Sequence, residues 1–294
     1  MKIGLHIADF TWPGGAAELA PTLTEIARWA DEAGVDRVSV MDHVWQIGHN
    51  GPPENEMLEA YTALGYLAAV TSRVKLLTLV TAVTYRDPGL LAKAVTTLDV
   101  LSGGRAMLGI GAAWNEDEAR GLGLFLPPLA ERFERLEETL QIVSQMWDPS
   151  QSQEPFNGKH YQLGRTLNSP QALAKPHPPI LIGGGGEKKT LRLVAQYADS
   201  VNLMAFTPAD VNRKVEILKE HCAAVGRSFD EIELTTIVRF DLGEHGENIE
   251  KTIEDLHALA EIGITVGHGG LKRVNDPATR DLFAERVIPA VAKL

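Results

Sequence analysis

Apolar and polar positions along this chain follow two rhythms that alternate from the first residues to the last. Short runs rich in Val, Ile and Leu are each followed by a longer stretch with apolar residues three or four positions apart. The first rhythm is typical of buried strands and the second of helices that cover them. The expected strands lie at 2–7, 36–41, 74–83, 105–111, 179–183, 200–204, 233–240 and 264–268.

A helical pattern separates most of these strands from the next. The expected helices lie at about 19–33, 57–71, 88–102, 127–147, 187–198, 208–225, 248–262 and 277–294. Eight strands followed by helices fit a closed (β/α)8 TIM barrel better than a doubly wound sheet, which remains the alternative. No repeat or convincing domain boundary interrupts the pattern, so residues 1–294 are expected to form one domain.

Residues 148–178 break this alternation. Prolines at positions 149, 155, 170, 176 and 178 preclude a long helix there, and no strand pattern is sustained. Irregular connections of that length are uncommon in compact domains and are often functional. We therefore expect an insertion that is either a lid or a surface excursion with a short hairpin.

Polar and aromatic side chains appear abruptly where the expected strand at 36–41 ends. Asp42, His43 and Trp45 follow it directly. Ligands of parallel α/β folds bind at the carboxyl ends of strands, which makes Asp42 and His43 candidates for a site. A helix N-cap beside a surface imidazole is the alternative interpretation. Further candidates at strand ends are Ala8 to Phe10, Val83 to Tyr85, Gly111 to Asn115, Gly183 to Gly186 and Met204 to Phe206.

A run of four glycines, Gly183 to Gly186, lies between an expected strand and the helix at 187–198. Glycines let a ligand approach the backbone, and a helix N-terminus offers unpaired amides with partial positive charge. Late barrel strands often bind phosphate at this position, so a phosphate site is expected at Gly184, Gly185 and Gly186. A tight turn without a ligand is the alternative.

Composition and charge argue against several classes of function. A net charge of −11 lacks the basic footprint of a nucleic-acid-binding protein. No apolar run is long enough to span a membrane, and the first residues lack the layout of a signal peptide. The one cysteine, Cys222, cannot form an internal disulfide, which favours a reducing cytoplasm. The nine histidines lack metal-ligand spacing, so no metal site is expected.

Several motifs follow one another in order over residues 1–205. They are Phe10 to Gly15 (FTWPGG), Met41 to His43 (MDH), Tyr85 to Pro88 (YRDP), Leu98 to Arg105 (LDVLSGGR), Gly109 to Glu116 (GIGAAWNE), Glu131 to Glu138 (ERFERLEE) and Lys175 to Gly184 (KPHPPILIGG). Taken together, these motifs resemble the luciferase-like monooxygenase superfamily, and in particular its branch that uses the deazaflavin coenzyme F420. FMN-dependent members of the superfamily are the alternative.

The resemblance implies a TIM barrel with an insertion after the fourth strand, and a homodimer formed through outer helices. It also implies that the deazaflavin lies across the strand ends, with its phosphate tail at the glycine run. Asp42 and His43 match a pair that binds the cofactor and donates a proton in the family's sugar-phosphate dehydrogenase. A non-proline cis peptide bond is implied at Ala82–Val83. The remaining cofactor contacts implied by the resemblance are Ile110, Gly111 and Asn115.

One departure from the family concerns the substrate. The sugar-phosphate dehydrogenase has a catalytic glutamate where this chain has Ala112, which leaves the substrate open. Four aromatic residues are expected to line the substrate site, and they are Phe10, Trp12, Trp45 and Trp114. Such a lining favours an apolar or flat organic substrate. The expected activity is hydride transfer between coenzyme F420 and a small organic molecule. The alternatives are an FMN-dependent monooxygenase fed by a separate reductase and a protein that binds such a cofactor without catalysis.

Overall fold

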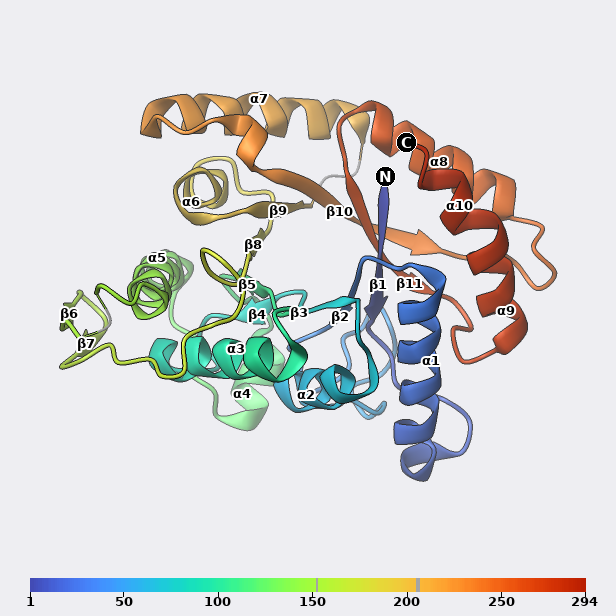
Figure 1. The fold of residues 1–294 in the computed structure, drawn as a ribbon, viewed down its shortest axis with the longest axis horizontal. Coiled ribbons are helices and arrows are strands. Elements are labelled where there is room, and N and C mark those ends of the chain that lie inside the picture. The colour runs from blue at the N-terminus through green and yellow to red at the C-terminus, as the bar shows by residue number, and fades with distance from the viewer. Residues whose placement is uncertain (152, 205–206) are drawn as a thin grey trace.

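The parallel strands expected from the alternating pattern form a barrel with helices around it (Figure 1). The computed structural model describes residues 1–151, 153–204 and 207–294, so the candidates Ala205 and Phe206 lie outside the described residues. The strands of the barrel are β1 (Lys2–Ile7), β2 (Arg37–Val40), β3 (Lys75–Thr78), β4 (Thr81–Ala82), β5 (Leu108–Gly111), β8 (Ile180–Gly183), β9 (Ser200–Leu203), β10 (Glu233–Phe240) and β11 (Val266–Leu271).

The order of the strands in the sheet is β3-β2-β1-β11-β10-β9-β8-β5-β4, and all neighbouring pairs are parallel. Because β3 and β4 are two pieces of one barrel strand, the sheet has eight strand positions. A bridge between Leu76 and Ala106 joins β3 to the residues before β5 and brings the two edges together. The result is a nearly closed TIM barrel, which confirms the predicted fold and excludes the doubly wound alternative.

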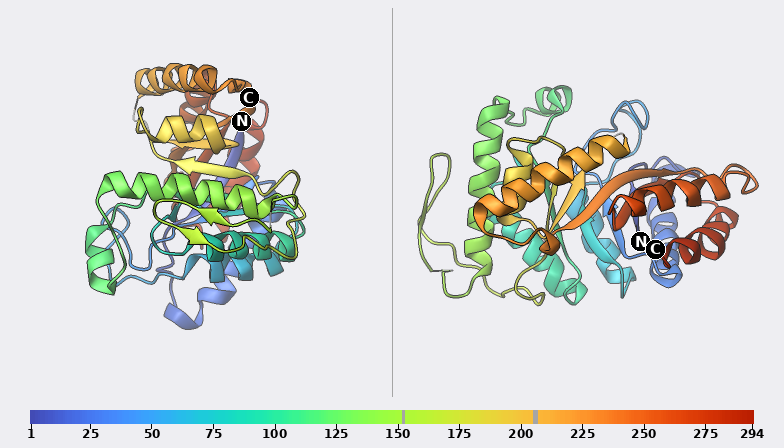
Figure 2. Two further views of the ribbon diagram at one scale, coloured as in Figure 1. Left: turned by 90° about the vertical axis from the view of Figure 1, so that its left-hand side faces the viewer. Right: turned by 90° about the horizontal axis from the view of Figure 1, so that it is seen from above.

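Helices from the connections between strands cover the outside of the barrel (Figures 1 and 2). In the first of them, buried residues such as Leu19, Leu23 and Ile26 recur three or four positions apart, and Gly34 ends it with a φ of 86°. Within the described ranges, no helix has both the length and the apolar character needed to cross a membrane. The α-helices are α1 (Leu19–Ala33), α2 (Ala60–Val70), α3 (Pro88–Ser102), α4 (Glu116–Leu122), α5 (Leu129–Trp147), α6 (Thr190–Tyr197), α7 (Pro208–Val225), α8 (Ile249–Glu261), α9 (Pro277–Leu282) and α10 (Ile288–Val291). Helical segments of other types are η1 (Gly15–Ala17), η2 (Phe229–Glu231) and η3 (Phe283–Val287).

The irregular stretch at 148–178 comes after the fourth barrel strand and α5. It contains an antiparallel hairpin of β6 (Phe156–Asn157) and β7 (Gln162–Leu163). The carboxylate of Glu138 on α5 accepts hydrogen bonds from the backbone amides of residues 159–161 and so holds the hairpin turn. None of the described residues of this stretch lines the cavity at the barrel mouth. The structure therefore favours the surface hairpin over the lid.

The third barrel strand differs from its prediction. The apolar run at 74–83 predicts one continuous strand, but β3 ends at Thr78 and β4 covers only Thr81–Ala82. The break comes where the chain changes partner, since β3 pairs with β2 and β4 pairs with β5. The non-proline cis peptide bond lies in this break, at Leu79–Val80, so the predicted position at Ala82–Val83 was wrong. Apolar residues continue through the break, and the hydrophobic pattern therefore does not locate it.

Candidate active site

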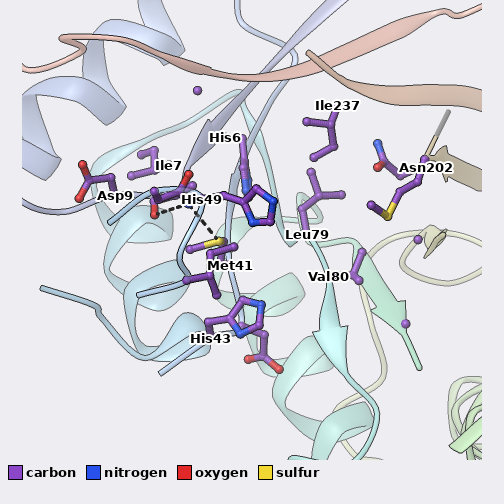
Figure 3. A pocket seen from close by; sticks show the side chains of 18 of the residues that line it. His6, Ile7, Asp9, Met41, His43, His49, Leu79, Val80, Asn202 and Ile237 are labelled. Carbon is purple, nitrogen blue, oxygen red and sulfur yellow. Dashed lines mark hydrogen bonds between the residues drawn. The ribbon is translucent and has the colours of Figure 1, made fainter. Parts of the chain in front are cut away.

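A cavity of about 1010 Å³ opens at the carboxyl ends of the barrel strands. Residues that belong to the eight strand positions, or for β2 follow directly after it, line its wall, as expected when parallel strands end at one face of a barrel. Figure 3 shows Met41 and His43, from the end of β2, on one side of this space and Asn202 and Ile237 on the other. The volume lies at the upper end of the range for sites that enclose a drug-sized ligand.

The structure brings eight of the predicted site residues together at this cavity. They are Trp12, Asp42, His43, Ala82, Gly111, Trp114, Asn115 and Gly184. Six others do not line it, and they are Phe10, Trp45, Val83, Ile110, Gly185 and Gly186.

Of the four predicted aromatic residues, two line the cavity, one is buried in the core and one, Trp45, is half-buried away from the cavity. Phe10 is fully buried, and its ring packs edge-on against Trp12 with the ring centroids 5.7 Å apart. The indole of Trp45 faces Gly121, where an added Cβ would lie 2.1 Å from the ring. Trp114, by contrast, lines the cavity with 58% of its surface exposed. Only Trp12 and Trp114 therefore remain candidates for direct contact with a substrate.

Two predicted cofactor contacts lie just behind the wall. Val83 and Ile110 are buried in the core around the barrel, whereas their chain neighbours Ala82 and Gly111 line the cavity. Successive residues of an extended chain point to opposite sides, so a contact assigned by position alone can fall on the wrong neighbour.

Only part of the glycine run faces the cavity. Gly184 lines it, but the carbonyl of Gly185 accepts a hydrogen bond from Lys214 Nζ at 2.8 Å, and a Cβ at Gly185 would lie 2.6 Å from the Met204 carbonyl oxygen. The following helix begins at Thr190 rather than at the predicted position 187. Because Thr190 also lines the cavity, a phosphate at this point would meet Gly184 and Thr190 rather than the whole run.

A carboxylate behind the cavity wall, which the sequence analysis did not select, is hydrogen-bonded to two residues that line the cavity. Glu118 lies on α4, and its side chain is fully buried. Its Oε2 atom is hydrogen-bonded to His43 Nδ1 at 2.7 Å and accepts from the Tyr85 hydroxyl at 2.6 Å. Its Oε1 atom accepts from the backbone amides of Val44 at 2.6 Å and Trp45 at 3.0 Å. One carboxylate thus joins the ends of β2 and β4 to α4.

These hydrogen bonds determine the protonation of Glu118. Burial raises its pKa, but the bonds from His43, Tyr85 and the Trp45 amide outweigh burial and lower the pKa of Glu118 to about 2. An ionised carboxylate can only accept, so His43 carries its hydrogen on Nδ1. The Nε2 atom of His43 makes no hydrogen bond within the described residues and is available to exchange a proton with a ligand.

The sequence contained a signal for α4 that the periodicity analysis passed over. The helix has seven residues, EDEARGL, with no apolar stripe. The Asn115 side chain accepts a hydrogen bond from the Glu118 amide at 3.2 Å, so the predicted cofactor contact also caps α4. Asn followed three residues later by Glu is the spacing of a capping box. That spacing predicts a helix start, although it does not predict the contact with His43.

Asp42 has a different set of partners from its neighbour His43. Its Oδ2 atom accepts hydrogen bonds from Arg86 Nη1 at 2.8 Å and from the Ala82 amide at 2.9 Å. Its Oδ1 atom is buried and has no partner among the described residues. Burial raises the pKa of Asp42, and Arg86 opposes that rise. A buried carboxylate oxygen without a partner, on a residue of the cavity wall, is a group that a ligand can satisfy.

A second histidine on the cavity wall was also missed. His6, on β1, is hydrogen-bonded through Nδ1 to the Ser39 hydroxyl at 2.9 Å. Burial lowers the pKa of His6 to about 4, against the opposing effect of Ser39. The ring is therefore neutral at neutral pH and acts through hydrogen bonding rather than charge. A single polar residue within an apolar strand gave no sign that it would face the cavity.

The fold and this site together define a barrel enzyme with one large strand-end cavity and a carboxylate-held histidine. A family model described as luciferase-like monooxygenase matches residues 1–281, and the chain belongs to that family. The family resemblance expected from the motifs is thereby confirmed. The family and the curated relatives identify the chain as an oxidoreductase.

Relatives with curated names extend this comparison. An uncharacterized protein of Mycobacterium tuberculosis is 33% identical over 210 residues, which are 71% of this chain and 67% of that protein. An F420-dependent glucose-6-phosphate dehydrogenase of Kineococcus radiotolerans is 28% identical over 289 residues, covering 96% of this chain and 81% of that protein. A pyrimidine monooxygenase of Allorhizobium ampelinum is 31% identical over 156 residues, covering 52% of this chain and 41% of that protein.

Solved structures share the fold at lower identity. An F420-dependent secondary alcohol dehydrogenase matches with a TM-score of 0.80 and 18% identity, covering 99% of this chain and 98% of that one. An EDTA monooxygenase from Chelativorans sp. BNC1 matches with a TM-score of 0.81 and 12% identity, covering 100% and 94% of the two chains. At these identities the agreement shows the barrel fold alone.

Proposed function

We propose that this chain is a coenzyme F420-dependent oxidoreductase that transfers a hydride between the deazaflavin and a small organic substrate. The observation that carries the proposal is the hydrogen bond between His43 and the buried carboxylate of Glu118, which presents a proton-transfer group at the cavity. Further support comes from four relatives named F420-dependent glucose-6-phosphate dehydrogenases, which are 26% to 31% identical to this chain.

The residues around the cavity fit a flat ring with a phosphate-bearing tail. Val80, from the break between β3 and β4, packs closely against two glycines of the wall. A Cβ added at Gly111 or at Gly183 would lie 2.9 Å from the Val80 side chain. These two positions therefore have no room for a side chain, and the cavity wall is flat there. In the same cavity, Asp42 Oδ1 offers a polar contact, because it has no partner within the part of the chain that the structure describes. These features suit a planar heterocycle that has polar edges.

Different residues of the chain have different roles in such an enzyme. The deazaflavin, when bound, supplies the carbon that carries the hydride. Asp42 contacts the ring system, and Gly184 and Thr190 receive the phosphate of the tail. His43 holds or releases a proton at Nε2, while Glu118 keeps a hydrogen on Nδ1 and stabilises the ring when it is charged.

The test is a titration of the purified apoprotein with coenzyme F420 and, separately, with FMN, followed by cofactor fluorescence. We expect F420 to bind at least tenfold more tightly than FMN, a difference of about 1.4 kcal/mol. Preference for FMN would refute the proposal and favour the flavin-dependent monooxygenase, a class represented by the pyrimidine monooxygenase relative. Tight F420 binding without turnover of any substrate in a broad panel would mean that the chain binds the cofactor but does not catalyse a reaction.

A further inference from the structure

Charge is distributed unevenly around the mouth of the cavity. The chain carries a net charge of −11, yet Arg239, Lys272 and Arg273 all line the cavity, with one carboxylate, Asp241, among them. The register of β10 and β11 explains this gathering. Arg239 is paired with Gly270, so the two basic residues that follow β11 lie close to the same level of the barrel. We call Arg239, Lys272 and Arg273 the cationic rim.

Part of the positive charge of the cationic rim is not neutralised by carboxylates. Arg239 is exposed and makes no hydrogen bond or ion pair within the described residues. Arg273 donates a hydrogen bond to the Gly243 carbonyl and makes no ion pair in the described part of the chain. Lys272 pairs with Asp241 at 3.1 Å, but 65% of the lysine side chain is exposed, and exposed pairs contribute little. Arg273 also interacts electrostatically with the carboxylates of Asp241 and Asp276. Three cations against these two carboxylates leave a net positive charge at this part of the mouth.

Exposed apolar side chains also line the same mouth. Trp114, Leu129 and Ile237 line the cavity although 58%, 54% and 51% of their surfaces are exposed. Large apolar side chains exposed at a cavity are typical of a ligand-binding surface. Trp114 packs against His43, with the ring centroids 5.3 Å apart. Figure 3 shows Ile237 across the space from His43. We call Trp114, Leu129 and Ile237 the apolar rim.

We propose that the substrate is an amphiphilic organic anion. Its apolar body lies against the apolar rim, and its carboxylate, phosphate or sulfonate binds the cationic rim. The identification of this anion as the substrate rests on the proposed function. The phosphate of the cofactor tail is assigned to Gly184 and Thr190, beside β8, and β8 is separated from β10 by β9 in the sheet. The cationic rim is therefore left for a second anionic group.

The test compares two fluorescent probes that differ by one sulfonate. They are 1-anilinonaphthalene-8-sulfonate and its uncharged analogue N-phenyl-1-naphthylamine. The Arg239→Gln/Lys272→Gln double variant should bind the sulfonate probe at least tenfold more weakly, with the affinity of the uncharged probe changed less than twofold. Both side chains are exposed, so folding should be retained, and circular dichroism checks this.

Two further variants make the comparison specific. Trp114→Ala should weaken both probes, because both carry the same apolar rings. Lys251→Gln, which removes an exposed cation on α8, should change neither. An unchanged affinity for the sulfonate probe in the double variant would overturn the proposal. An equal loss for both probes would overturn it as well.

Titrations with the cofactor distinguish whether the cationic rim binds an anionic substrate or the anionic tail of F420. F420 and its chromophore without the phosphate-bearing tail are titrated into the parent and the double variant. Equal affinities in the two proteins support the substrate assignment. Selective weakening of F420 with its tail would mean that the cationic rim binds the cofactor, which overturns the assignment. If the parent binds no F420 but still discriminates between the probes, the proposed function fails and the anion site stands.

Discussion

Replacing Glu118 by glutamine removes a charge while keeping the shape of the side chain. In the parent protein each carboxylate oxygen takes part in two hydrogen bonds, with four donors in all. An amide has only one oxygen, so its NH2 group must face two of the groups that donated to the carboxylate. We expect Glu118→Gln to destabilise the fold at neutral pH and to deprive His43 of its charged partner.

The size of the effect follows from the proton affinity of Glu118. Its hydrogen bonds lower the pKa of Glu118 from 4.5 to about 2. Each pH unit of such a shift corresponds to about 1.4 kcal/mol, so the ionised group stabilises the fold by roughly 3 kcal/mol. Because the pKa is lower in the folded state, this contribution is complete well above pH 4.5 and is lost as the pH falls towards 2.

The assay is urea denaturation of the parent, Glu118→Gln and a control, Glu116→Gln, from pH 7 to pH 3. Glu116 lies in the same first turn of α4 but is exposed, so its replacement should change the free energy of unfolding by less than about 0.5 kcal/mol. The free energy of unfolding of Glu118→Gln should be roughly 3 kcal/mol below that of the parent at pH 7. This deficit should narrow by roughly 2 kcal/mol at pH 3. A deficit that stays constant over this range would mean that the charge of Glu118 does not stabilise the fold.

Three further predictions concern the cavity wall. Asp42→Ala should weaken F420 binding at least tenfold in a fluorescence titration, and unchanged affinity would remove Asp42 from the site. Thr190→Val should weaken F420 about tenfold, or about 1.4 kcal/mol, and leave the tail-less chromophore unaffected; equal effects on both would separate Thr190 from the phosphate. The pKa of His6 is lowered from 6.5 in the unfolded chain to about 4 in the folded protein. The unfolded chain therefore binds the proton more readily, and stability that is present above pH 6.5 is lost as the pH falls towards 4. The parent should therefore lose roughly 3 kcal/mol of stability across this window, and His6→Asn should lose less; the same pH slope in both proteins would contradict this.

Periodicity predicted those elements in which one pattern persists without interruption. The predicted bounds 208–225 and 233–240 are the observed bounds of α7 and β10. The break between β3 and β4 was missed because Leu79 and Val80 continue the apolar run. The helix α4 was missed because seven mostly polar residues carry no stripe that a periodicity analysis can detect.

The same physical reasons explain which parts of the site could be predicted. Asp42, His43 and Asn115 were expected to meet because the carboxyl ends of barrel strands share one face, and all three line the cavity. Glu118 could not be assigned to His43, 75 residues away, because their contact depends on how α4 packs against the barrel. Phe10 was assigned to the cavity by position, but its side chain turns into the core.

We expect His43 to transfer the proton, while cofactor binding depends on other residues. The most direct measurement compares His43→Ala with the parent protein for F420 affinity and for turnover, followed by the absorbance of F420 with a substrate found among amphiphilic anions. We predict an affinity within twofold of the parent and turnover reduced by roughly 10²–10⁴-fold. A His43→Ala protein that binds F420 and turns over at the parent rate would mean that the proton comes from water or another residue.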